Sequence, residues 1–233
     1  MTHPLHIPDW AVARSALMNR FPPLIPARAA IIVVDMQAAF VDEQAVFPNP
    51  HALAIVPRIN ALVDAARKAG AAILWSRHRV VEDGPGQQPA WQRFAGSLSL
   101  LSTPHLHAGA PGQALHDGLH VAERDLIFDK YRFSCFVNAA IDLDGWLRAR
   151  GIEDVFICGT ISNCCCESTA RDAAMRDYRV RFLSDATAAL TDEEHAAALL
   201  NASAIVGQVV TTQQAIDQFA GRSGPAQTGE ETA

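Results

Sequence analysis

The chain has 233 residues, 49% hydrophobic and 19% charged, with a formal net charge of −6. This composition is typical of a globular enzyme with one large domain or two small ones. The acidic balance argues against nucleic acid or an anionic membrane surface as a partner, because both require a basic patch.

The sequence also favours a cytoplasmic location. No apolar run approaches the roughly 20 residues of a membrane-spanning helix, and the N-terminus carries no signal-peptide pattern. The cysteine count is five, which is odd, and three of the cysteines are contiguous. That pattern is a poor disulfide framework and suits a reducing compartment.

The chain divides into three predicted regions. Residues 1–28 are rich in proline and predict an arm with one short helix. Residues 29–220 carry the pattern of a folded domain, and residues 221–233 are small and polar, which is typical of a disordered tail.

Within the domain, apolar strands alternate with amphipathic helices. The predicted strands are 29–34, 71–75, 125–128, 154–158, 179–183 and 205–211. The predicted helices are 50–69, 139–150, 164–177, 192–204 and 212–219. Strands that are apolar on both faces indicate a parallel sheet covered by helices. The sequence therefore predicts an α/β fold: three layers, doubly wound, with a central, mostly parallel sheet of about six strands.

Polar residues follow several of these strands. Asp35 follows the first strand, Lys130 the third, and the contiguous cysteines 164–166 the fourth. The carboxyl ends of parallel strands meet at one edge of a sheet, where α/β proteins bind their ligands. Each residue alone has an ordinary structural explanation, but a thiol beside a carboxylate and an ammonium has what it needs to become a nucleophile.

Three contiguous cysteines allow three interpretations: a nucleophile, a metal cluster or a redox pair. Contiguous cysteines cannot all reach one tetrahedral ion, and the sequence has no Cys-x-x-Cys motif. It also has no glycine-rich nucleotide motif. We therefore expect neither a metal nor a cofactor.

Three segments resemble the signatures of the isochorismatase-like cysteine hydrolases, and the resemblance covers roughly residues 29–215. They are residues 30–37 (AIIVVDMQ), 130–134 (KYRFS) and 159–173 (GTISNCCCESTARDA). The third is the most specific and fits the family pattern with one change, Ser162 in place of threonine.

The resemblance implies a role for each residue. Cys165 would be the nucleophile, Asp35 the general base, and Lys130 the cation that holds Asp35 and stabilises the thiolate. The backbone amides of Ile161 and Cys165 would form the oxyanion hole, next to a cis peptide between residues 160 and 161.

The resemblance also favours one branch of the family. A cysteine nucleophile favours amidohydrolases over isochorismatases proper, which cleave a vinyl ether by acid chemistry. Nicotinamidases carry an Asp-x-His metal pair after the second strand, but the matching stretch here, WSRH at 75–78, has no aspartate. His105 and His107 remain as spare candidate ligands.

The sequence is most similar to ureidoacrylate, carbamoylsarcosine and related ureido or amide hydrolases. That similarity implies a small amide or ureido substrate, with Arg77, His78 and Phe133 lining its site, and a homodimer or homotetramer. Three alternatives stay open: a vinyl-ether hydrolase, a nicotinamidase-like amidase, and a non-catalytic thiol-sensing protein.

Overall fold

A computed structural model of the chain describes residues 2–4, 7–45, 47–81, 83–84, 86–87, 89, 104–137 and 139–222. The predicted tail, 221–233, lies outside the described residues from position 223 onward. Among the described residues, no helix combines the length and the apolar character needed to cross a membrane.

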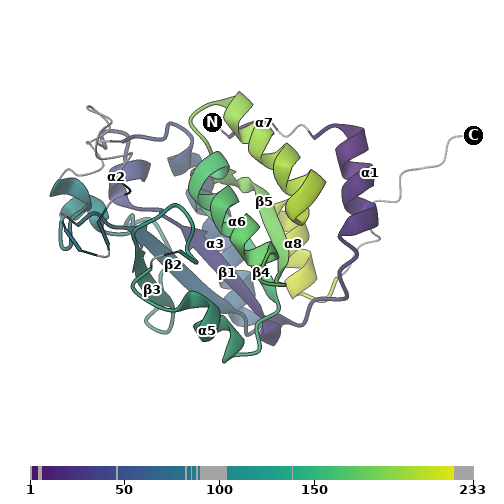
Figure 1. Ribbon diagram of the computed structural model, residues 1–233. Helices are drawn as coiled ribbons and strands as arrows, with labels where there is room; N and C mark the ends of the chain where they lie inside the picture. Colours follow the sequence, from purple (N-terminus) through teal and green to yellow (C-terminus); the bar gives the residue numbers. More distant parts are fainter. Residues whose placement is uncertain are drawn as a thin grey trace, which may run out of the picture.

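A parallel sheet of six strands forms the centre of the described part of the molecule (Figure 1). The strand order is β3-β2-β1-β4-β5-β6, and every neighbouring pair is parallel. The strands are β1 (Ala29–Val34), β2 (Ala72–His78), β3 (Leu126–Lys130), β4 (Asp154–Thr160), β5 (Arg179–Ala188) and β6 (Gln208–Val210). The predicted α/β class is confirmed, and the sheet is wholly rather than mostly parallel.

Helices cover both faces of this sheet, which gives the three predicted layers. On one face lie α3 (Ala52–Lys68) and α8 (Thr212–Phe219). On the other lie α5 (Leu143–Arg148), α6 (Glu167–Ala174) and α7 (Asp192–Asn201). The alternation of β1 shows why both faces are apolar: Ile31 and Val33 belong to one core, Ile32 and Val34 to the other.

The remaining elements are short. The predicted arm contains α1 (Asp9–Met18), which packs against the turn η6 (Ala202–Val206) after α7, at the edge of the molecule (Figure 1). The other short elements are α2 (Ala38–Val41), η1 (Pro26–Arg28), η3 (Pro104–Leu106), η4 (Pro111–Gln113) and the π-helical turn η5 (Ser162–Cys166).

Several predicted boundaries differ from the observed ones. The helix expected from residue 139 begins only at Leu143, because the carboxylate of Asp142 accepts the Gly145 amide and caps the helix there. The helix expected over 164–177 is divided into η5 and α6. β3 extends to Lys130, two residues beyond its predicted end, so Lys130 belongs to the strand itself.

Gly159 allows β4 to pass close to β1 at the end of the sheet where both strands stop. Its φ is +111°, and a Cβ added there would lie 2.1 Å from the carbonyl oxygen of Val34. Only glycine tolerates both this backbone conformation and this close approach. The residues that follow Gly159 are therefore placed beside the end of β1.

We predict that Gly159→Ala lowers the free energy of unfolding by roughly 2–5 kcal/mol, from backbone strain and a steric clash together. Urea unfolding measures this loss. Gly70→Ala is the control, because Gly70 also has a positive φ (+92°) but no atom within 4 Å of the added Cβ. The control should lose only the backbone contribution, roughly 1–2 kcal/mol; equal losses in the two variants would contradict the steric explanation.

Candidate active site

The three predicted catalytic residues meet at the carboxyl edge of the sheet. Lys130 is the last residue of β3, Asp35 directly follows β1, and Cys165 lies in η5 after β4. The Lys130 ammonium is 2.7 Å from the Asp35 carboxylate and 3.5 Å from the Cys165 sulfur. One buried cation therefore contacts both the predicted base and the predicted nucleophile.

The surroundings of Lys130 use its full donor capacity. Its third partner is the carbonyl oxygen of Arg132, at 3.0 Å. An ammonium has three N–H groups, and each has an acceptor here. Burial alone would lower the pKa of Lys130, but the charges of Asp35 and Cys165 raise its pKa above the ordinary value. The side chain is therefore charged at neutral pH.

Asp35 is held in an unusual backbone conformation, with a φ of +50°. Its amide donates to Ser76, and the Ser76 hydroxyl donates to the Asp35 carboxylate at 2.7 Å. Few residues other than glycine, aspartate and asparagine adopt a positive φ. β2 and β3 thus orient the two carboxylate oxygens, one toward Ser76 and the other toward Lys130.

Cys165 belongs to η5, which we call the nucleophile turn. The peptide bond that leads into this turn, Thr160–Ile161, is cis, as predicted. The Cys166 amide donates to the Ile161 carbonyl at 3.2 Å, and the Thr169 hydroxyl donates to the Cys165 carbonyl at 2.7 Å. Thr169 in turn accepts from the amide of Cys135 at 3.1 Å, which ties the turn to the segment after Lys130.

The cysteines have different environments. Burial raises the pKa of Cys158 and of Cys166, so both are protonated, unreactive thiols. A hydrogen bond with Cys164 and burial raise the pKa of Cys165, against the opposing effect of Lys130. The same hydrogen bond lowers the pKa of Cys164. Of these four thiols, Cys165 is the one that contacts the buried ammonium.

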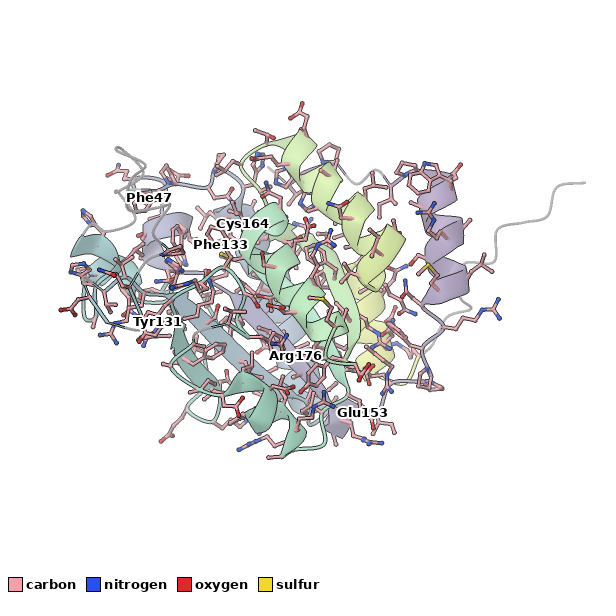
Figure 2. The ribbon with its side chains drawn as sticks, viewed as in Figure 1. Phe47, Tyr131, Phe133, Glu153, Cys164 and Arg176 are labelled. Carbon is pink, nitrogen blue, oxygen red and sulfur yellow. The ribbon has the colours of Figure 1, made fainter. Side chains whose placement is uncertain are left out.

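His78, one of the three predicted substrate-lining residues, lies close enough to Lys130 and Asp35 for their charges to affect its pKa. Burial and the charge of Lys130 lower its pKa to about 4, so its ring is neutral at pH 7. Its Nδ1 is buried and has no hydrogen-bond partner in the described structure. Figure 2 shows Phe133 and Cys164 at the same end of the sheet.

The side chain of Arg77 pairs with Asp129 rather than with a member of the triad. Its guanidinium forms a salt bridge with Asp129 at 2.7 Å. Arg77 pairs with Asp129, and His78 with Lys130, in the register of β2 and β3. Because neighbouring strand residues face opposite sides of a sheet, Arg77 points away from the face that carries Lys130.

Among the described residues, one group of metal-ligating side chains is close enough to hold an ion: His3, His51 and Asp192. Nε2 of His3 accepts the Ala189 amide proton, so the ring proton of neutral His3 is on Nδ1, where Asp192 accepts it at 2.7 Å. Both ring nitrogens of His3 are therefore in use, and these residues fit a hydrogen-bonded cluster better than a metal site. His105 and His107 belong to no such group within the described residues. The absence of a catalytic metal stays a prediction.

Sequence reasoning missed the side chains that orient the triad. Ser76 is the polar residue directly after the predicted strand 71–75, and it could have been identified from that position. Thr169 lies four residues after Cys165, which on a helix places its hydroxyl near the Cys165 carbonyl. The sequence did not indicate His195, which contacts Ser162 in the turn, or His3, which stacks on His195.

Comparison with known proteins agrees with this geometry. The model of the isochorismatase domain family matches residues 29–214. The chain belongs to the isochorismatase family. It is 34% identical to the ureidoacrylate amidohydrolases RutB of Methylobacterium radiotolerans, over 80% of this chain and 77% of that protein, and of Caulobacter vibrioides, over 82% and 90%.

A solved structure gives the same result. A cysteine hydrolase from Pseudomonas syringae pv. phaseolicola matches with a TM-score of 0.79 and 31% identity, over 88% of this chain and 97% of that one. The predicted isochorismatase-like family and the predicted class, a hydrolase of carbon–nitrogen bonds other than peptide bonds, are confirmed. The predicted boundaries of the arm, domain and tail stay predictions.

We predict that Asp35→Asn destabilises the protein by roughly 3–5 kcal/mol, because it leaves the buried Lys130 ammonium without a carboxylate. Asparagine tolerates the left-handed backbone at this position, so the loss reflects charge rather than conformation. The matched control is the double variant Asp35→Asn/Lys130→Met, which should recover most of the lost stability in urea unfolding. A double variant whose loss equals the sum of the two single losses would show that the pair is not coupled.

Proposed function

We propose that this protein is a cysteine-dependent hydrolase that cleaves a carbon–nitrogen bond of a small amide, ureido or carbamoyl substrate. The observation that carries the proposal is the position of the Lys130 ammonium, in contact with both the Asp35 carboxylate and the Cys165 sulfur. A carboxylate, a cation and a thiol in this arrangement provide a base, a charge stabiliser and a nucleophile.

The mechanism begins with a protonated thiol, because the pKa of Cys165 is raised in the free protein. Asp35 takes the thiol proton as the sulfur attacks the carbonyl carbon, and Lys130 stabilises the thiolate. The carbon–nitrogen bond then breaks, and Asp35 returns the proton to the leaving nitrogen. A water molecule hydrolyses the resulting thioester, releasing the acid or carbamate and restoring the thiol.

The developing oxyanion needs hydrogen-bond donors close to Cys165. We assign this role to the backbone amides of Ile161 and Cys165, which lie at the entrance and within the nucleophile turn. Donors fixed by a folded turn require no reorganisation during the reaction, and the loss of one such donor typically costs about 2.7–4 kcal/mol of transition-state stabilisation.

The names of the relatives support this chemistry. Two relatives at 34% identity are ureidoacrylate amidohydrolases, and a structure at 31% identity is a cysteine hydrolase. We propose that the substrate belongs to the same ureido or amide class. A neutral His78 suits such a substrate, because its ring exchanges hydrogen bonds with ureido N–H and C=O groups without adding a charge.

The compartment and assembly are part of the proposal. All five cysteines are free, as expected for a protein of the reducing cytoplasm. The homodimer or homotetramer implied by the family resemblance stays a proposal, with Phe133 as a further substrate-lining residue.

We predict that Cys165→Ala lowers turnover by about 10⁴-fold or more, because no other group supplies the nucleophile. The assay is ammonia release from a panel of ureido acids, carbamoyl amino acids, nicotinamide, biuret and maleamate. Cys164→Ala is the matched control, since it removes the neighbouring thiol and leaves the contact between Lys130 and Cys165. The control should keep turnover within about tenfold of the original protein.

Acid quenching during turnover, followed by mass spectrometry, should detect an acyl group on the peptide that contains Cys165. Full turnover by Cys165→Ala, together with no trapped acyl group on the original protein, would overturn the cysteine mechanism in favour of a vinyl-ether hydrolase. Stoichiometric zinc or iron in the purified protein would instead favour the nicotinamidase-like alternative.

A further inference from the structure

His195 connects α7 to the first residue of the nucleophile turn. Its Nδ1 is 2.9 Å from the Ser162 hydroxyl, and its Nε2 is 3.0 Å from the Ser184 carbonyl oxygen. A carbonyl oxygen only accepts, so the ring proton is on Nε2, and Nδ1 accepts the hydroxyl proton of Ser162. His195 and Ser162 are both fully buried, so this hydrogen bond is shielded from water.

His3 covers the ring of His195. The two rings are stacked, with centroids 4.3 Å apart and planes inclined by 13°. Hydrogen bonds to the Asp192 carboxylate and from the Ala189 amide fix the orientation of His3. The segment at residues 2–4 thus reaches the region of the nucleophile turn, although it precedes the domain in sequence.

Asn49 holds Thr160, the residue that precedes Ile161. Nδ2 of Asn49 donates to the Thr160 hydroxyl at 2.8 Å and to the Ala188 carbonyl at 3.2 Å. Thr160 and Ser162 flank Ile161, whose amide we assign to the oxyanion hole. Each flanking residue is therefore held by a buried side chain from a different element.

We propose that His195 is a positioning residue for the nucleophile turn, and that His3, stacked on its ring, covers it and keeps it in place. The proposal rests on the proposed function, because the turn it positions carries Cys165 and the oxyanion donors. The N-terminal segment is then part of the machinery that sets the geometry of the active site, rather than a passive extension of the domain.

His195 can accept the hydrogen bond from Ser162 only while its ring is neutral. An imidazolium ring has two donors and no acceptor, so protonated His195 could not accept from Ser162. The titratable groups that face His195 are His3 from the N-terminal segment, His51 before α3 and Asp192 on α7. The other polar groups that contact His195 are the carbonyl of Ser184 in β5 and the hydroxyl of Ser162 in the nucleophile turn. Burial is the main cause that lowers the pKa of His195 to about 4.

His3→Ala uncovers the ring of His195, and because burial is the largest cause of its lowered pKa, that pKa should rise toward the ordinary value of about 6.5. In His3→Ala, the ratio of kcat at pH 6 to kcat at pH 8 should fall by up to about fourfold, following the ring titration. Nuclear magnetic resonance of the histidine ring protons measures the titration directly. Asn19→Ala is the matched control: it removes the bond from the end of α1 to the Gly207 carbonyl, and it leaves His3 and His195 untouched. The control should leave the ratio at its original value.

Two substitutions of His195 itself complete the experiment. His195→Ala should lower kcat by up to about a hundredfold, the scale of loss expected from a misplaced reacting group. His195→Asn places a non-titrating carbonyl oxygen near Ser162, so it should recover most of that loss and make the ratio insensitive to His3→Ala. A merely structural role would lower the melting temperature of these variants without changing the ratio.

An unchanged pH ratio and an unchanged His195 titration in His3→Ala would overturn the proposal. If no member of the amide panel is turned over, the proposed function fails separately. The positioning role is then decided by the rate of Cys165 alkylation by iodoacetamide at pH 6 relative to pH 8. The proposal requires that His3→Ala change this relative rate and that Asn19→Ala leave it unchanged.

Discussion

The candidate active site depends on one buried cation, the ammonium of Lys130. The Lys130 ammonium is fully inaccessible to solvent, and the Asp35 carboxylate at 2.7 Å compensates for the loss of its hydration. An isolated charge at such a depth would be strongly unfavourable, whereas a paired and fully hydrogen-bonded one is tolerated. The Cys165 sulfur and the Arg132 carbonyl take the two remaining donors. The same contacts that make the lysine tolerable in the interior therefore place a base and a thiol around it.

The parallel sheet makes this arrangement possible. β1, β3 and β4 end at one edge, so Asp35, Lys130 and the nucleophile turn converge although they are about 95 and 35 residues apart in sequence. β2 lies between β1 and β3 and contributes Ser76 to Asp35 and His78 to the same face as Lys130. Gly159 lets β4 approach β1 where the chain enters the turn. The geometry of the candidate site is thus a consequence of strand order and of close backbone packing.

The sequence predicted those parts of the structure that have a local signature. The strands are continuous apolar runs, and the polar residue after each run indicated Asp35, Lys130 and the cysteines. Non-local contacts had no such signature. His3 and Asp192 are 189 residues apart, and Ser162 and His195 are 33 apart, so neither pair could be inferred from spacing. Helix boundaries also differed where one side chain decides them, as the Asp142 carboxylate does at α5. The similarity to ureido and amide hydrolases implied Arg77 as a lining residue, and its salt bridge with Asp129 is a contact that this similarity did not indicate.

The three contiguous cysteines show how the fold gives different chemistry to identical side chains. Successive residues in a helical turn point in directions about 100° apart, so the three thiols cannot share one environment. Cys166 is fully buried against the apolar core, where burial keeps its thiol protonated. Cys165 points to the Lys130 ammonium, and Cys164 contacts Cys165 through a hydrogen bond that raises the pKa of one thiol and lowers that of the other. Lys130 stabilises a thiolate at Cys165, but Cys164 and burial oppose it, so the proposed mechanism starts from a protonated thiol and requires a base. Reactivity at this turn is therefore controlled by the direction in which each sulfur points, and that direction is set by the hydrogen bonds that hold the turn at both of its ends.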